Sequence, residues 1–142
     1  MYLVFDTETT GLPRNWSAPL NDLENWPRVV QIAWQLHGKK GDLLEAKSFL
    51  IKPNGFNIPF KAQDIHGIST ELASRDGLEL EKVVQEFLNA IKKSRFLIGH
   101  NLKFDTNVLG AEFIRAGINP KLLDLPILDT CTQRTAKVTQ IK

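Results

Sequence analysis

The sequence lacks several features that would assign it to other protein classes. Cys131 is its single cysteine, so an internal disulfide is excluded. No paired histidine pattern indicates a nucleophilic cysteine, so Cys131 is expected to be a small core residue. No apolar run approaches the roughly 20 residues that a membrane-spanning helix needs. Met1 leads directly into an apolar segment, without the basic region or cleavage site of a signal peptide. These absences predict a soluble cytoplasmic protein that does not bind membranes.

An excess of charge of one sign is also lacking. The chain has 18 basic and 16 acidic residues, and its formal charge of +2 is too small to argue for nucleic acid by itself. Hydrophobic residues at 42% and charged residues at 24% are globular values, which exclude a disordered chain. At 142 residues the chain can bury one substantial core but not two, so we expect a single domain over residues 1–142.

The most informative segment is the start of the chain, MYLVFDTETTGL. If it forms a strand, Leu3 and Phe5 point to one face, and Asp6 and Glu8 point to the other. The two carboxylates then lie roughly 6–7 Å apart along the strand. At about 5 Å and an effective dielectric of about 20, their repulsion costs on the order of 3 kcal/mol. A bound Mg²⁺ or Mn²⁺ would relieve it, and the alternative is an edge strand whose acidic end is solvated.

The rest of the chain predicts strands and helices in alternation. Two β-rich segments around the turn 37–41 predict an antiparallel hairpin, and a strong apolar stripe predicts the first long helix. A strand after that helix implies a parallel addition to the sheet. The segment 58–69 is expected to be irregular or a short helix. The expected strands and helices span residues 28–36, 43–51, 79–93, 95–99, 101–116 and 125–129.

A loop rich in Pro and Asn separates the first two strands, over residues 13–27. Two interpretations of its tryptophans remain open. Trp16 and Trp26 either pin a surface excursion, which is the favoured interpretation, or belong to a flap where an aromatic ring stacks on a base.

A third carboxylate stands in the sequence GHNLKFDTNVL. Asn101 is well placed to cap the helix that follows, and Asp105 lies in the first turn, where the helix dipole tolerates negative charge. The apolar residues that follow Asp105 at helical spacing are Val108, Leu109, Phe113 and Ala116. Asp105 therefore heads the face that packs on the sheet, although Glu112 on the same side weakens this argument. A metal shared with Asp6 and Glu8 would supply the partner that an inward carboxylate needs.

Two of these segments resemble motifs of one enzyme family. FDTETTGL at residues 5–12 resembles the first motif of the DEDD 3'→5' exonucleases, the DnaQ-like family that includes proofreading subunits of bacterial DNA polymerase III. HNLKFD at residues 100–105 resembles the second motif. The resemblance implies that Asp6, Glu8 and Asp105 are catalytic residues and ligands of two Mg²⁺ or Mn²⁺ ions.

The same resemblance implies contacts with the substrate. In the family the Thr-Thr-Gly turn lies against the 3'-terminal nucleotide, and a segment similar to IHGIS at residues 65–69 lines the pocket for the terminal base. By residue type alone, a histidine before glycine is more often structural. The resemblance reverses this preference for substrate contact at His66, but not for catalysis. The implied substrate-binding residues are Thr9, Thr10, Gly11, Leu12, His66, Asn101 and Phe104.

The family's third motif does not appear in this sequence. It would supply a fourth Asp, preceded on the same helix by the His or Tyr that activates the attacking water. No Asp or Glu follows Asp129, and no His or Tyr follows His100. The resemblance runs from Tyr2 to about Thr135, so we expect a chain that lacks the last helices of its domain and is nearly inactive by itself. The similarity around residues 65–69 favours the histidine subclass.

The resemblance implies an α/β fold of the ribonuclease H-like type, a mixed sheet with three antiparallel strands followed by parallel strands and helices. It also implies two-metal hydrolysis of phosphodiester bonds at single-stranded DNA 3' ends, in proofreading or repair, with a DNA polymerase subunit as partner. Two alternatives remain open. One is a non-catalytic nucleic-acid-binding or polymerase-assembly module, and the other is an exoribonuclease, since nothing in the sequence reads a 2'-hydroxyl.

Overall fold

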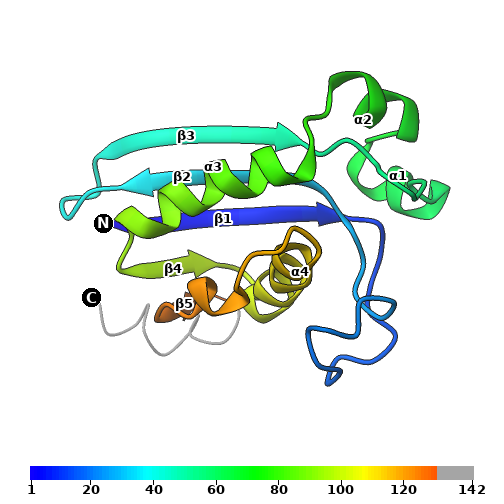
Figure 1. Ribbon diagram of the computed structural model, residues 1–142. Coiled ribbons are helices and arrows are strands. Elements are labelled where there is room, and N and C mark those ends of the chain that lie inside the picture. The colour runs from blue at the N-terminus through cyan, green and yellow to red at the C-terminus, as the bar shows by residue number, and fades with distance from the viewer. Residues whose placement is uncertain (131–142) are drawn as a thin grey trace.

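A five-stranded mixed sheet organises residues 1–130, the part of the chain that the computed structural model describes (Figure 1). Its strands are β1 (Tyr2–Thr9), β2 (Val29–His37), β3 (Leu43–Leu50), β4 (Phe96–Gly99) and β5 (Ile127–Asp129). The spatial order is β3-β2-β1-β4-β5, so β1 lies at the centre. The pairs β1–β2 and β2–β3 are antiparallel, whereas β1–β4 and β4–β5 are parallel. The predicted hairpin and the predicted parallel addition are both confirmed.

One face of β1 forms the centre of the core. Leu3, Phe5 and Thr7 are buried while the residues between them are more exposed, which confirms the predicted alternation. The helix α3 (Leu80–Lys93) lies across this face of the sheet (Figure 1). Phe87 of α3 is fully buried, and its ring lies 5.2 Å from that of Phe5 and 5.3 Å from that of Trp34, measured between centroids. Burial of such side chains stabilises the fold by about 1.5–3 kcal/mol each.

Two short helices, α1 (Phe60–His66) and α2 (Thr70–Asp76), close the end of the sheet at which β1 and β3 terminate (Figure 1). The sequence predicted at most one short helix over residues 58–69, and α2 was missed. A seven-residue helix has too few turns to show a periodic stripe. The residues between the two helices mark their ends instead. Gly67 ends α1 with a φ of 76°, and Ser69 begins α2, where its hydroxyl accepts a hydrogen bond from the Leu72 N–H.

The helix α4 (Leu102–Arg115) begins in a way that the sequence did not predict. Asn101 occupies the N-cap position in the left-handed region, with a φ of 57°, and its side chain makes no capping hydrogen bond. A side-chain cap normally requires an extended backbone at this position. The Asp129 carboxylate replaces it, accepting hydrogen bonds of 2.8 Å from the N–H groups of Asn101 and Leu102. The prediction that the Asn101 side chain caps α4 is wrong.

The remaining element is a short 3₁₀ helix, η1 (Pro120–Leu123), which leads into β5. It fills the gap between α4 and the predicted last strand. The predicted helix after Asp129 and the predicted burial of Cys131 lie outside the described residues. No helix in the described part of the chain has the length and apolar character needed to cross a membrane.

The cap supplied by Asp129 is testable by Asp129→Ala. Loss of two N–H···carboxylate hydrogen bonds should lower the free energy of unfolding by about 1–2 kcal/mol, measured by urea denaturation. Asp124→Ala is the matched control, because Asp124 is exposed and its side chain makes no hydrogen bond or ion pair among residues 1–130. Equal denaturation midpoints for the two variants would contradict the capping role.

Candidate functional site

Three acidic side chains lie at the carboxyl-terminal half of β1: two belong to the strand and one comes from α4. Asp6 is exposed and Glu8 is partly exposed on one face of the strand, whereas Asp105 of α4 is only 4% exposed. Thr7 lies between the two strand carboxylates in sequence and points to the opposite face. Its hydroxyl donates a hydrogen bond to Oδ1 of Asp105. The predicted inward orientation of Asp105 is therefore present, and its direct partner is Thr7.

The charge of Asp105 is poorly tolerated in this position. Burial raises the pKa of its carboxyl to about 7, and the charges of Asp6 and Glu8 raise it as well, against the opposing effect of the Thr7 hydrogen bonds. No Lys, Arg or His forms an ion pair with Asp105 among residues 1–130. A buried carboxylate without a cation, close enough to two others for repulsion, is a favourable setting for a divalent ion.

The chemistry of these donors fits a hard divalent cation, because all three are carboxylates. Residues 1–130 contain no group of three His, Cys, Asp or Glu side chains that already has the arrangement of a metal site. Asp105 is held by Thr7, while Asp6 and Glu8 leave the opposite face of β1. The structure thus brings the expected ligands to one end of the strand without assembling them around a common point.

A cleft of about 490 Å³ opens beside this end of β1. Its walls are the end of β1 and the following turn, one side of α1, and Phe104 at the start of α4. Of the predicted substrate-binding residues, those that line the cleft are Thr9, Thr10, Gly11, Leu12, His66 and Phe104. Asn101 is not among the lining residues; it is exposed at the N-cap of α4. Glu8 also lines the cleft, so the cleft adjoins the acidic residues.

His66 fixes one wall of this cleft. Its Nε2 lies 3.2 Å from the backbone oxygen of Thr9, and its Nδ1 lies 3.1 Å from the backbone nitrogen of Ile68. These partners match a tautomer in which Nε2 donates to Thr9 and Nδ1 accepts the Ile68 N–H. Neither nitrogen is then available as a base. The ring ties α1 to the end of β1 and leaves its face for contact with a ligand.

The two tryptophans of the loop before β2 behave differently. Trp26 is buried, and its Nε1 donates a hydrogen bond of 2.9 Å to the backbone oxygen of Pro19, so it pins the loop. Trp16 is 49% exposed, and its ring centroid lies 5.6 Å from that of Phe104. The favoured interpretation, in which a tryptophan pins the loop, therefore describes Trp26. Trp16 instead lies against Phe104, a residue that lines the cleft.

An ion cluster on α4 was missed by sequence reasoning. Glu112 is 1% exposed, and its carboxylate lies 2.8 Å from Nε of Arg28 and 2.8 Å from Nη1 of Arg115. It also accepts the Val29 N–H. Arg115 stands three residues after Glu112, which is a local signal for pairing. Arg28 is 84 residues away in sequence, and no local pattern predicts its contact.

Comparisons with known proteins place these features in a family. A model described as "Exonuclease" matches residues 3–139. The DNA polymerase III PolC-type protein of Streptococcus sanguinis is 35% identical over 129 residues, which are 91% of this chain and 8% of that protein. The PolC-type protein of Mycoplasmopsis pulmonis is 34% identical over 113 residues, 80% of this chain and 7% of that protein.

The fold is shared with solved structures of E. coli Exonuclease I. One of them, a complex with a dT13 oligonucleotide, has a TM-score of 0.74 and 22% identity, covering 91% of this chain and 27% of that one. The expected ribonuclease H-like α/β fold is thereby confirmed. The chain spans only a small part of the length of these relatives and of this solved structure.

The raised pKa of Asp105 predicts a pH-dependent stability when divalent ions are removed by EDTA. The pKa of the Asp105 carboxyl is about 7 in the folded state, against an ordinary pKa of 3.8. The protonated carboxyl therefore contributes its full stability below pH 3.8, and this contribution is lost as the pH rises through 7. Between these values the loss is at most about 1.4 kcal/mol per pH unit.

Asp105→Asn should therefore be more stable than the wild type at pH 8, and the difference should shrink toward pH 4. Thermal melts of both proteins across this range measure it, and the difference between them cancels the titration of all other groups. Asp124→Asn serves as the exposed control. Stability curves for Asp105→Asn and wild type that run parallel with pH would show that Asp105 is not the titrating group.

Proposed function

The chain belongs to the DEDD-type 3'→5' exonuclease family, and we propose that it removes nucleotides from single-stranded 3' ends of DNA. The observation that carries the proposal is the position of the cleft. It joins the turn after β1 to Glu8, next to a buried Asp105 whose charge has no cationic partner in the described part of the chain. An acidic centre beside a cleft with apolar walls suits a phosphodiester whose terminal nucleotide is held in that cleft.

Members of this family generally use divalent metal ions. We propose that Asp6, Glu8 and Asp105 hold Mg²⁺ or Mn²⁺ here, with two ions as the expected number. Support comes from the carboxylate donors and from the raised pKa of Asp105, since a nearby cation would favour the charged carboxylate and oppose that increase. When bound, such ions supply a water of lowered pKa and stabilise negative charge on the leaving oxygen.

The chain's own residues would bind and orient the terminal nucleotide. Gly11 has a φ of 156°, a conformation that side-chain-bearing residues rarely adopt, so the turn exposes backbone to the cleft. Leu12 is 72% exposed and Ile65 is 81% exposed, although both line the cleft. Apolar side chains in this position can cover the faces of a base or sugar. His66 holds the turn in place through Thr9.

We further propose that turnover by this chain alone is slow. The sequence has no carboxylate after Asp129 and no His or Tyr after His100, so it supplies neither a fourth ligand nor the family's base. Loss of a general base typically costs about 10²–10⁴-fold in rate. Binding of the 3' end does not require that base, and binding therefore provides a second measure of the function.

The similarity to PolC-type proteins supports a role in DNA replication, with proofreading as the proposed task, a DNA polymerase as the proposed partner and the cytoplasm as the proposed location. Among the neighbours in fold, Exonuclease I is seen with a dT13 oligonucleotide, which favours DNA over RNA as the strand. An RNA strand of the same sequence is the direct comparison, because this chain has no identified contact to a 2'-hydroxyl.

Metal binding should appear as a change in thermal stability. In millimolar Mn²⁺ the wild type should melt at a higher temperature than in EDTA, and saturation at 100 times the dissociation constant corresponds to about 2.7 kcal/mol. Asp6→Asn should lose most of this gain, because it removes one ligand charge. In EDTA it should melt no lower than the wild type, because a repulsive charge is gone. The same melting temperature in all four conditions would contradict a metal site.

The nuclease itself is tested with a 5'-labelled single strand and Mn²⁺. We expect a slow ladder of products shortened from the 3' end, no cutting of a circular single strand, and no ladder with Asp105→Asn. In Ca²⁺, fluorescence anisotropy should show tighter binding of the single strand than of a blunt duplex. Cleavage of the circle would identify a different nuclease. Absence of both the ladder and the single-strand preference would overturn the proposed function.

A further inference from the structure

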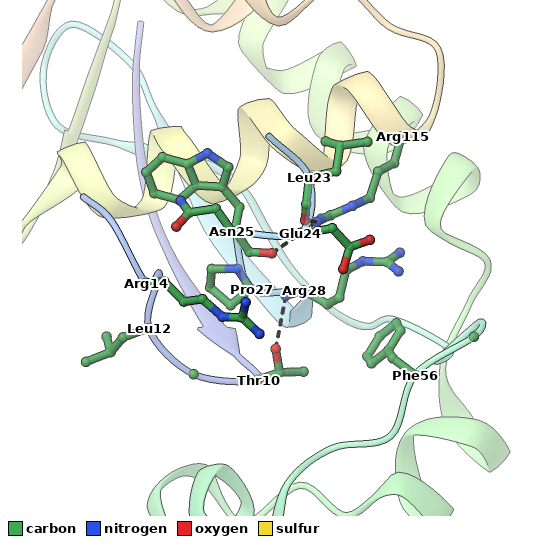
Figure 2. A pocket seen from close by; sticks show the side chains of 13 residues that line it. Thr10, Leu12, Arg14, Leu23, Glu24, Asn25, Pro27, Arg28, Phe56 and Arg115 are labelled. Carbon is green, nitrogen blue, oxygen red and sulfur yellow. Dashed lines mark hydrogen bonds between the residues drawn. The ribbon is translucent and has the colours of Figure 1, made fainter. Parts of the chain in front are cut away.

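A second cleft lies on the other side of the turn after β1 (Figure 2). Its volume is also about 490 Å³. Thr10, Gly11 and Leu12 line both clefts, so this turn is the ridge between them. The other walls come from the loop before β2, from Phe56 and from the end of α4. The proposed function uses only the first cleft.

The second cleft is rich in arginine. Arg14, Arg28 and Arg115 all line it, and Figure 2 shows the three side chains arranged around the same space. Two carboxylates oppose them: Glu24 in the lining, and Glu112, which is buried behind the arginines and pairs with Arg28 and Arg115. Three guanidinium groups thus face two carboxylates, which leaves an excess of positive charge. We call this space the arginine cleft.

The arginines differ in how they are held. Arg28 is fixed by Glu112 at its Nε and Nη2, and its Cζ lies 4.5 Å from the centroid of the Phe56 ring. Its Nη1 has no acceptor among the described residues. Arg14 is exposed, and its side chain makes no hydrogen bond or ion pair within residues 1–130. The cleft therefore combines one immobilised guanidinium and one unpaired guanidinium, both with donors to offer an anion.

The ridge between the two clefts is low. A Cβ built on Gly11 would meet no atom within 4 Å, so the space above the turn is open. A three-residue turn spans at most about 11 Å. Even at the rise of about 3.4 Å per nucleotide of each strand in duplex DNA, a strand can therefore cross it within a few nucleotides. No side chain at Gly11 stands in the way of such a path.

We propose that the arginine cleft binds backbone phosphates of the substrate strand a few nucleotides upstream of its 3' end. This inference rests on the proposed function, because the terminal nucleotide is assigned to the first cleft. The strand would cross Gly11, and Arg14 and Arg28 would contact its phosphates. Phosphate contacts of this kind position a strand without reading its sequence. The binding should therefore depend on strand length and on salt, and not on base sequence.

The test measures binding of 5'-labelled dT2 and dT8 in Ca²⁺ by fluorescence anisotropy, over a range of salt concentrations. A dinucleotide reaches the first cleft alone, whereas an octanucleotide also reaches the arginine cleft. Arg14→Gln removes the unpaired charge, and Arg14→Lys retains it. Arg95→Gln is the matched control, because Arg95 is also exposed and unpaired among the described residues but precedes β4, at the opposite end of the sheet.

We expect Arg14→Gln to weaken dT8 binding about 3- to 10-fold, to leave dT2 binding within about twofold, and to reduce the salt slope by about 0.7. Arg14→Lys should retain most of the dT8 affinity, and Arg95→Gln should resemble the wild type. If the wild type binds dT8 but Arg14→Gln behaves like Arg95→Gln, or weakens dT2 and dT8 equally, the arginine cleft is not on the strand path. Failure of the wild type to bind either oligonucleotide would overturn the proposed function together with this inference.

Discussion

The hydrogen bond from Thr7 to Asp105 is the interaction on which the candidate site depends. It joins the central strand to α4, the helix that closes the core beside β4. It also places a carboxylate where burial and two neighbouring negative charges disfavour ionisation. The contact therefore joins strand and helix, while burial and the neighbouring charges create the local electrostatic instability that a cation would relieve. Stability without metal and function with metal are expected to oppose each other at this residue.

Two buried carboxylates on α4 show how the environment separates structural from functional roles. Asp105 and Glu112 are seven residues apart, about two helical turns, and both face the protein interior. Glu112 is neutralised by two guanidinium groups and a backbone N–H, so its charge stabilises the loop before β2. Within residues 1–130, Asp105 has hydrogen bonds from Thr7 and repulsive acidic neighbours. Both are carboxylates on the same side of α4, and their partners differ: Glu112 pairs with Arg115 of the same helix and with the distant Arg28.

The turn after β1 is positioned from both sides. On one side His66 binds the backbone oxygen of Thr9, and on the other the Thr10 hydroxyl accepts the Arg28 N–H. These contacts hold the backbone around Gly11 in a conformation that few residues other than glycine adopt. The first motif therefore does more than supply carboxylates. Its Thr-Thr-Gly part forms a fixed ridge that both clefts share, which links the first cleft to the arginine cleft.

Local patterns determined much of this protein from the sequence alone. The alternation in β1, the hairpin, the stripe on α3 and the spacing of Asp105 reflect periods of two or 3.6 residues, which short segments reveal without neighbours. Only the tertiary structure decided that Asp129 caps α4, that Arg28 pairs with Glu112, and that Arg14 and Phe56 line one cleft. These contacts join residues that lie tens of positions apart in the sequence. The helix α2 was not predicted for a different reason, because seven residues are too few to show a helical period. A contact between distant segments depends on how the chain is folded back, and no local propensity records it.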